Sequence, residues 1–168
     1  MAQKRIREGF KNQILYVIPR HILPGFTDHP LVEPLIPTDM GWYPDARFHY
    51  CERKNGAQEH ILILCLKGSG CYDIDGERGI LQANHAILIP RNTPHVYWAS
   101  DTDPWSIYWV HFKGSSADFF GQTTTAERGL PQVGEVDSCA RQIFNDILVL
   151  LYDNVARGNP IDPNAMNG

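Results

Sequence analysis

The feature that most constrains this chain is a series of short segments in which apolar residues alternate or run continuously, separated by Gly- and Pro-rich turns. A repeat of two residues places successive side chains on opposite faces of a β-strand. Five such segments follow one another: residues 46–53 (ARFHYCER), 60–66 (HILILCL), 71–81 (CYDIDGERGIL), 85–90 (HAILIP) and 105–112 (WSIYWVHF). Strands at this spacing predict a mainly β fold, a small antiparallel barrel or sandwich.

The turns between these segments support the same interpretation. Asp75-Gly76 divides residues 71–81 at a point where a tight hairpin turn needs positive φ angles. In residues 46–53, alternation places Arg47, His49, Cys51 and Arg53 on one face. The segment 60–66 is apolar on both faces, as expected for a strand that is covered on both sides.

The two ends of the chain have a different character. The first 45 residues are rich in proline and turn formers and lack sustained periodicity, which indicates an irregular N-terminal arm that leads into the first strands. Residues 137–158 predict a helix, with Asp137 or Ser138 as N-cap and Gly158 as the stop. Its broad apolar face packs on the barrel or also pairs with a second copy of the chain. The candidate dimerisation residues are Ile143, Ile147, Leu150 and Leu151.

Composition excludes several classes of function. The chain has 168 residues and a net charge of −4, so it lacks the basic surface expected of a domain that binds DNA directly. No apolar run reaches the length of a membrane span, and the basic start is not followed by the apolar core of a secretion signal. We therefore expect no membrane partner and a cytoplasmic location. Four cysteines without a C-x-x-C pair predict reduced thiols.

Metal and nucleophile motifs are incomplete. His95 follows a proline turn, as in half of a metal-binding barrel motif, but Ile61 stands where the glutamate of the other half is expected. His60 and His95 alone are too few ligands for a metal ion. No G-x-S-x-G elbow or other nucleophile motif is present. We expect no catalytic residues, no metal and no cofactor.

A binding pocket is the remaining site-level prediction. Alternation places Trp105, Ile107, Trp109 and His111 on one face of residues 105–112, facing Arg53, with His95 and Tyr97 added from the segment after the proline turn. Flat aromatic rings beside a guanidinium suit a small polar ligand with an apolar side. The alternative is that the aromatic residues are core and that Arg53 pairs with a neighbouring acid, such as Glu52 or Asp45.

The chain resembles the N-terminal regulatory domain of AraC-type transcription regulators. The matching motifs are TDMGWYPDARFHYCER, ILILCLKGSGCYDIDG, AILIPRNTPHVYWAS and DPWSIYWVHFKG, which together span residues 38–114. The resemblance implies a cupin-like antiparallel β-barrel (jelly roll), an N-terminal arm over the bound effector, and C-terminal helices that dimerise. It also implies ligand contacts from Arg53, Tyr97, Trp109 and, with a less secure register, Thr38. The position of a late-strand histidine in the arabinose activator is Ile107 here, which argues against arabinose as the ligand.

From these observations we expect three regions: an arm and first strands at 1–45, an effector-binding barrel at 46–120, and a loop, dimerisation helix and start of a linker at 121–168. The predicted ligand-binding residues are Thr38, Arg53, His95, Tyr97, Trp105, Trp109 and His111. The expected function is non-enzymatic sensing of a small molecule, plausibly a sugar, by a homodimer whose helix-turn-helix DNA-binding domain lies beyond residue 168. The alternative is a metal-dependent cupin enzyme that acts on a sugar or a small acid.

Overall fold

The computed structural model describes residues 4–21, 23–24, 30–119 and 133–156, and the side chains of residues 148 and 150–156 lie outside the description. The described chain forms ten strands and one long helix. They are β1 (Ile14–Val17), β2 (Ile36–Tyr43), β3 (Tyr50–Arg53), β4 (His60–Lys67), β5 (Ser69–Ile74), β6 (Glu77–Gln82), β7 (His85–Ile89), β8 (His95–Ala99), β9 (Ser106–Lys113), β10 (Val133–Glu135) and α3 (Ser138–Ala156).

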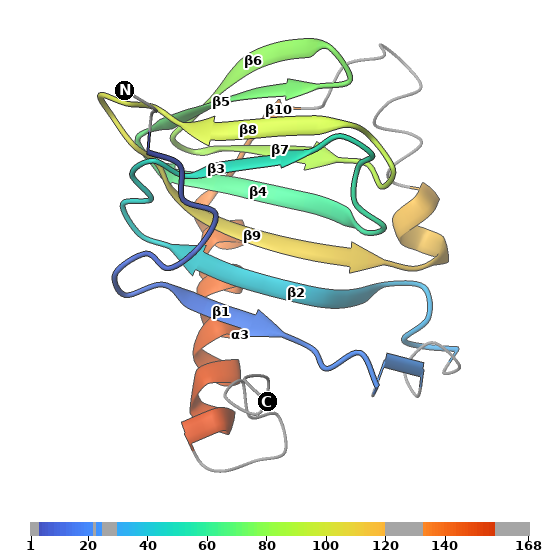
Figure 1. Ribbon diagram of the computed structural model, residues 1–168. Helices are drawn as coiled ribbons and strands as arrows, with labels where there is room; N and C mark the ends of the chain where they lie inside the picture. Colours follow the sequence, from blue (N-terminus) through green and yellow to red (C-terminus); the bar gives the residue numbers. More distant parts are fainter. Residues whose placement is uncertain (1–3, 22, 25–29, 120–132, 157–168) are drawn as a thin grey trace.

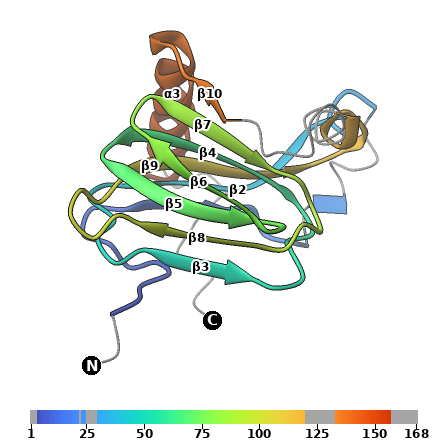
Figure 2. The ribbon, with the colours of Figure 1, turned by 90° about the horizontal axis from the view of Figure 1, so that it is seen from above.

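The strands form two antiparallel sheets that face each other (Figures 1 and 2). The larger sheet has the order β1-β2-β9-β4-β7-β10, and the smaller sheet has the order β3-β8-β5-β6. Helix α3 lies on the outer side of the larger sheet (Figure 2). The prediction of a mainly β, antiparallel barrel with a C-terminal helix is therefore confirmed.

The core between the sheets is apolar and aromatic. Its fully buried members include Ile61 and Ile63 of β4, Leu81 of β6, and Trp105, which precedes β9. The Trp105 ring lies directly against Gly70 of β5, in the space that a Cβ atom would occupy. Burial of such large side chains supplies most of the stabilising free energy of a domain of this size.

The strand predicted from residue 46 begins only at Tyr50. Asp45 and Phe48 have φ angles of 43° and 65°, so the chain turns twice before it becomes extended. Arg47 is exposed in this turn and does not share the inward face. His49, Cys51 and Arg53 do share it, as alternation predicts, because all three line the space between the sheets.

The larger sheet takes in residues that the sequence analysis assigned to the arm and first strands. β2 is an inner strand of this sheet, between β1 and β9, with Tyr43 opposite Ile107 and Met40 opposite Val110. Most of its residues are buried on both faces, so no alternation marks it in the sequence. Upstream, Ile6 pairs with the residues beside His49 through backbone hydrogen bonds of 2.9 Å, which lays the N-terminal segment along the smaller sheet.

The predicted hairpin is confirmed. β5 and β6 pair from Ser69 opposite Gln82 to Ile74 opposite Glu77. Asp75 and Gly76 have φ angles of 51° and 88°, the left-handed conformation that this turn requires.

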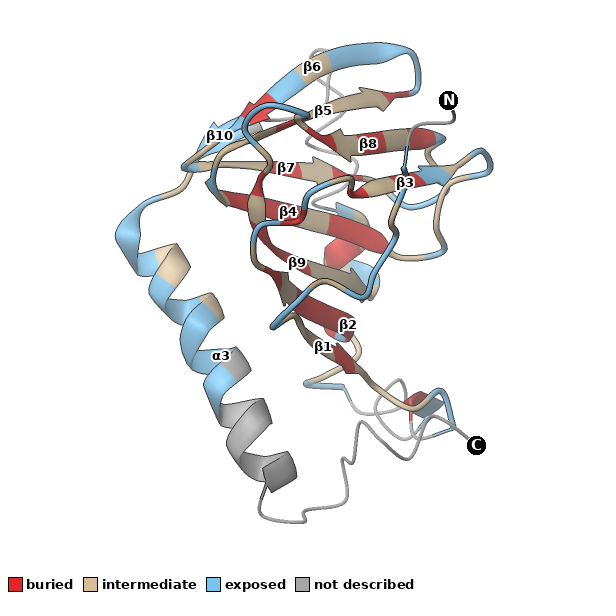
Figure 3. Cartoon of the chain, turned by 60° about the vertical axis from the view of Figure 1, so that its left-hand side comes forward, coloured by how far each residue is buried: buried red, intermediate tan, exposed pale blue. Residues whose placement is uncertain are grey.

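Helix α3 begins as the sequence predicts. Asp137 caps it, since its Oδ1 accepts a hydrogen bond of 2.8 Å from the Ala140 backbone N–H. On its inner side Phe144 stacks on Tyr108 of β9, with ring centroids 5.8 Å apart. Most of the described helix surface is exposed (Figure 3), including Ile143 and Ile147.

The four cysteines are free thiols: Cys51 and Cys65 are buried, Cys71 is partly buried and Cys139 is exposed. Within the part of the chain that the structure describes, no helix combines the length and the apolar character that crossing a membrane requires.

The contact between Gly70 and Trp105 gives a direct test of the packing. We expect Gly70→Ala to lower the free energy of unfolding by about 1–3 kcal/mol, because the added methyl group overlaps the indole ring of the neighbouring sheet. Urea unfolding of the purified domain measures this change. Gly134→Ala on β10 is the matched control, because its Cβ would meet no atom within 4 Å. Equal stabilities of the two variants would contradict the tight sheet-to-sheet contact.

Candidate functional site

A cavity of about 240 Å³ lies between the two sheets. Its lining is polar at two places and apolar between them. The lining residues are Arg7, Glu8, Leu15, Val17, Arg20, Asp39, Tyr43, His49, Cys51, Arg53, Ile63, Tyr97, Ile107, Trp109 and His111. Both sheets and the segment before β2 therefore contribute to one site.

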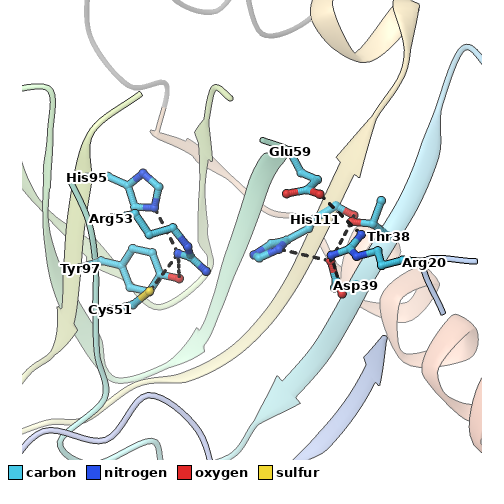
Figure 4. Close-up of polar contacts among 9 residues, drawn as sticks. All are labelled: Arg20, Thr38, Asp39, Cys51, Arg53, Glu59, His95, Tyr97 and His111. Atoms are coloured by element: carbon cyan, nitrogen blue, oxygen red, sulfur yellow. Dashed lines mark hydrogen bonds and ion pairs between the residues drawn. The ribbon is translucent and has the colours of Figure 1, made fainter. Parts of the chain in front are cut away.

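Arg53 is the centre of the first polar cluster (Figure 4). It ends β3, where its side chain points inward, and its Nη1 donates hydrogen bonds to Tyr97 Oη at 3.2 Å and to Cys51 Sγ at 2.9 Å. The third partner of Nη1 is His95 Nε2, at 3.2 Å. The pairing of β3 with β8 places Arg53 opposite His95, so the register of the smaller sheet builds this cluster.

His95 holds Arg53 in place as a neutral acceptor. Its Nδ1 lies 2.7 Å from the Thr93 carbonyl oxygen, which can only accept, so Nδ1 carries the proton and Nε2 offers its lone pair to Arg53. Burial lowers the pKa of His95 to about 4, and the positive charge of Arg53 acts in the same direction.

His49 is a second neutral imidazole in the wall of the cavity. Trp105 Nε1 donates a hydrogen bond of 3.2 Å to His49 Nδ1, which places the remaining proton of the ring on Nε2. Burial lowers the pKa of His49 to about 3, with a further contribution from Arg53. Both histidines near Arg53 are therefore uncharged at neutral pH.

Asp39 is the centre of the second polar cluster (Figure 4). Its carboxylate accepts hydrogen bonds from Thr38 Oγ1 at 2.8 Å and Arg20 Nη2 at 3.1 Å, and His111 Nδ1 lies 3.6 Å away. Burial alone would raise the pKa of Asp39, but the bonds from His111 and Thr38 and the charge of Arg20 lower it overall. Arg20 also lies 3.5 Å from Glu59. This cluster connects β2, β9 and the segment after β1.

Trp109 contributes the largest flat surface of the lining. Its ring is packed between Tyr43 and His111, at centroid distances of 5.5 and 5.1 Å, and only Gly41 allows it to lie so close to β2. The indole Nε1 is buried and has no hydrogen-bond partner in the described structure. A buried N–H without a partner costs free energy.

The structure brings together four of the seven predicted ligand-binding residues in the cavity lining: Arg53, Tyr97, Trp109 and His111. The other three lie behind this lining. Thr38 is bonded to Asp39, His95 to Arg53, and Trp105 is core that bonds His49. Direct contact of Thr38, His95 and Trp105 with a ligand stays a prediction. Their positions behind the lining do not favour it.

Sequence reasoning missed Asp39, Arg20 and His49 as site residues. Alternation already placed His49 beside Arg53, so this signal was available. Nothing local marks Asp39 or Arg20, because they meet only through the pairing of β1, β2 and β9.

The cavity offers no cluster of metal ligands in the described residues, where no group of three or more His, Cys, Asp or Glu side chains converges. Ile61, which stands at the position of the missing glutamate, is buried core in β4. His60 is engaged elsewhere, 3.0 Å from Asp118. The expectation of a site without metal stays a prediction.

A comparison with known families decides the assignment. The family model described as AraC-like ligand binding domain matches residues 43–162, more than two thirds of the chain. The chain belongs to this family. This match confirms the resemblance stated from the sequence motifs. In this AraC-type domain the cavity is lined by residues of the matched region and by residues that precede it.

Two curated relatives are regulators of bacterial operons. The MmsAB operon regulatory protein of Pseudomonas aeruginosa is 36% identical over 104 residues, which cover 60% of this chain and 34% of the relative. The arabinose operon regulatory protein of Salmonella typhimurium is 29% identical over 94 residues, 55% of this chain and 32% of that protein. The matched region spans about a third of the length of these relatives.

Solved structures similar to this AraC-type domain include cupin barrels. A cupin 2 conserved barrel domain protein from Salinispora arenicola matches with a TM-score of 0.42 and 18% identity, covering 73% of this chain and 98% of that chain. A cupin 2 protein from Leptotrichia buccalis matches with a TM-score of 0.40 and 16% identity, covering 64% and 44%.

The two buried histidines predict a loss of stability on acidification. An unfolded histidine has a pKa near 6.5, whereas His49 and His95 have folded pKa values of about 3 and 4. Below pH 6.5 the unfolded chain binds protons that the folded chain does not, so the free energy of unfolding falls as the pH is lowered from 6.5 towards 4. Each histidine contributes a slope of up to about 1.4 kcal/mol per pH unit.

Urea unfolding between about pH 7 and pH 5 measures this slope. We expect His95→Gln to reduce it by the contribution of one histidine, while His21→Gln, at an exposed position, leaves it unchanged. A slope that is the same in wild type and His95→Gln would show that His95 is not kept neutral by the fold.

Proposed function

We propose that this AraC-type domain senses a small polar effector, a sugar or a sugar derivative, in the cavity between its sheets. The observation that carries this proposal is the cavity itself, which Arg53, its bonded partner Tyr97 and the flat ring of Trp109 all line. Aromatic rings stack on the C–H faces of sugars, while guanidinium and indole N–H groups donate hydrogen bonds to their oxygens.

The N-terminal arm is the element that we propose to transmit ligand binding. Five lining residues precede β2, namely Arg7, Glu8, Leu15, Val17 and Arg20. A ligand that contacts them binds more tightly when the arm is in place than when it is displaced, and so shifts the arm towards the closed position by that difference in affinity.

We further propose that the native regulator binds DNA through a helix-turn-helix domain that follows this chain, and that the position of the arm alters the arrangement of these DNA-binding domains. The regulatory relatives, which are about three times as long as the matched region, support this proposal. The net charge of −4 agrees with a separate DNA-contacting surface.

The effector-binding role is tested by calorimetry with a panel of monosaccharides, disaccharides and sugar acids. We expect at least one compound to bind, and Arg53→Ala to weaken its binding about tenfold or more through loss of a charge-assisted hydrogen bond. Trp98→Ala is the matched control, because Trp98 belongs to β8 but does not line this cavity. Equal binding to wild type and Arg53→Ala would place the ligand elsewhere.

We propose that two copies pair through helix α3. Ile143 and Ile147 are spaced by one helical turn and remain 52% and 41% exposed, while Phe144 holds the helix on its own barrel. Leu150 and Leu151, the other predicted dimerisation residues, continue this helix, but their side chains lie outside the described residues.

Sedimentation velocity at micromolar concentration tests the pairing. We expect wild type to sediment as a dimer and the double variant Ile143→Ser/Ile147→Ser to sediment as a monomer, since two apolar contacts are removed from the interface. Gln142→Ala, at an exposed polar position of the same helix, is the control. A dimer that persists in the double variant would exclude these residues as the interface.

A further inference from the structure

The charge of the cavity lining is opposite to that of the chain. Its charged residues are three arginines, Arg7, Arg20 and Arg53, against two acids, Glu8 and Asp39. Three positive and two negative groups leave an excess of one positive charge, although the whole chain carries −4. Arg20 lies between two acids, Asp39 and Glu59, so the positive charge of the lining is carried by Arg7 and Arg53.

Arg53 carries a positive charge that no ion pair with a described carboxylate balances. Arg20 has two acidic neighbours, whereas Arg53 forms no ion pair with any described carboxylate. The adjacent acid, Glu52, points to the opposite face of β3, where its Oε2 accepts a hydrogen bond of 3.0 Å from Tyr50. A guanidinium in the interior of a protein is costly unless a counter-charge is nearby.

The guanidinium of Arg53 also has N–H groups that no described residue accepts from. Its described hydrogen bonds all involve Nη1, whose two N–H groups are shared among the neutral partners Cys51, His95 and Tyr97. The N–H groups of Nη2 and Nε have no described partner. Figure 4 shows this guanidinium directed from β3 into the space towards His111. Two neighbouring N–H groups in one plane match the two oxygens of a carboxylate.

A second donor of the lining lies near Arg53. His49 carries its remaining proton on Nε2, because its Nδ1 accepts from Trp105. Of the two carboxylates of the lining, Asp39 is already occupied by Thr38 and Arg20, and Glu8 belongs to the N-terminal arm. A hydroxyl group can accept from Arg53 but also brings a donor of its own, whereas a carboxylate brings acceptors only, together with the opposite charge.

We propose that the effector of this domain carries a carboxylate, which binds Arg53, together with at least one hydroxyl group on a short carbon skeleton that packs on Trp109. Hydroxy acids and sugar acids are the chemical class that fits. This inference rests on the proposed effector-binding role of the same cavity and narrows it from sugar derivatives in general to anionic ones.

The test compares matched pairs that differ in the carboxylate: D-gluconate with D-glucose, D-glycerate with glycerol, and L-lactate with propane-1,2-diol. Calorimetry on the wild-type domain at low salt and neutral pH measures each Kd. We expect the acid of at least one pair to bind about tenfold or more tightly than its neutral partner, as one charge-assisted pair provides. Failure of all the acids to bind with a Kd below about 10 mM would overturn the inference.

Variants of Arg53 locate the effect. Arg53→Gln keeps hydrogen-bonding capacity but removes the charge, so we expect it to abolish the preference for the acid, whereas Arg53→Lys keeps a charge and retains part of it. Arg91→Gln is the control, because Arg91 pairs with Asp118 outside the cavity. Urea unfolding of each variant verifies that it is folded. An acid preference that survives in Arg53→Gln would overturn the assignment of the carboxylate to Arg53.

The remaining outcomes separate this inference from the proposed function. A neutral sugar that binds at least as tightly as its acid, and loses binding in Arg53→Gln, would leave the sensor role standing and overturn the carboxylate. Binding that is unchanged in both Arg53→Gln and Trp109→Ala would overturn this inference and the proposed function together, because the cavity would then not be the effector site.

Discussion

The packing of Trp105 against Gly70 is the contact on which the rest of the barrel depends. The indole is 1% exposed and occupies the space that any other residue at position 70 would fill with its side chain. The same ring donates to His49, so one residue joins the apolar core to the wall of the cavity. Because the two sheets pack tightly at Trp105, His49 is held at a fixed place in the cavity lining.

The hydrogen-bond partners of Arg53 in the cavity wall are all uncharged. His95 and His49 lie close to Arg53, and their lowered pKa values keep two further positive charges away from it. Tyr97 and Cys51 fix the guanidinium through hydrogen bonds without neutralising it. The cluster around Asp39 is different, since its charges are paired within the protein. At the Asp39 end of the cavity the charges are therefore paired within the protein, whereas at the Arg53 end the guanidinium has no ion-pair partner among the described residues.

Much of the fold is predictable from the sequence, because alternation and turn chemistry mark strands such as β5 and β6 directly. β2 is hidden, since a strand buried on both faces loses its alternation and its neighbours in sequence are prolines. In the site, residues on one strand face, such as Arg53 and Cys51, follow from period two. Asp39 and Arg20 do not, because their meeting depends on pairing between strands far apart in sequence, and no local pattern specifies that pairing.

The arm supplies five of the fifteen residues around the cavity, a third of the binding wall. A segment with this double role cannot change its grip on the barrel without also changing which compounds fit. Under the proposed sensing role, substitutions that loosen Ile6 from the residues beside His49, or Arg20 from Asp39, are expected to alter ligand binding and the position of the arm together. New specificity and a new threshold of response would then arise from the same few positions.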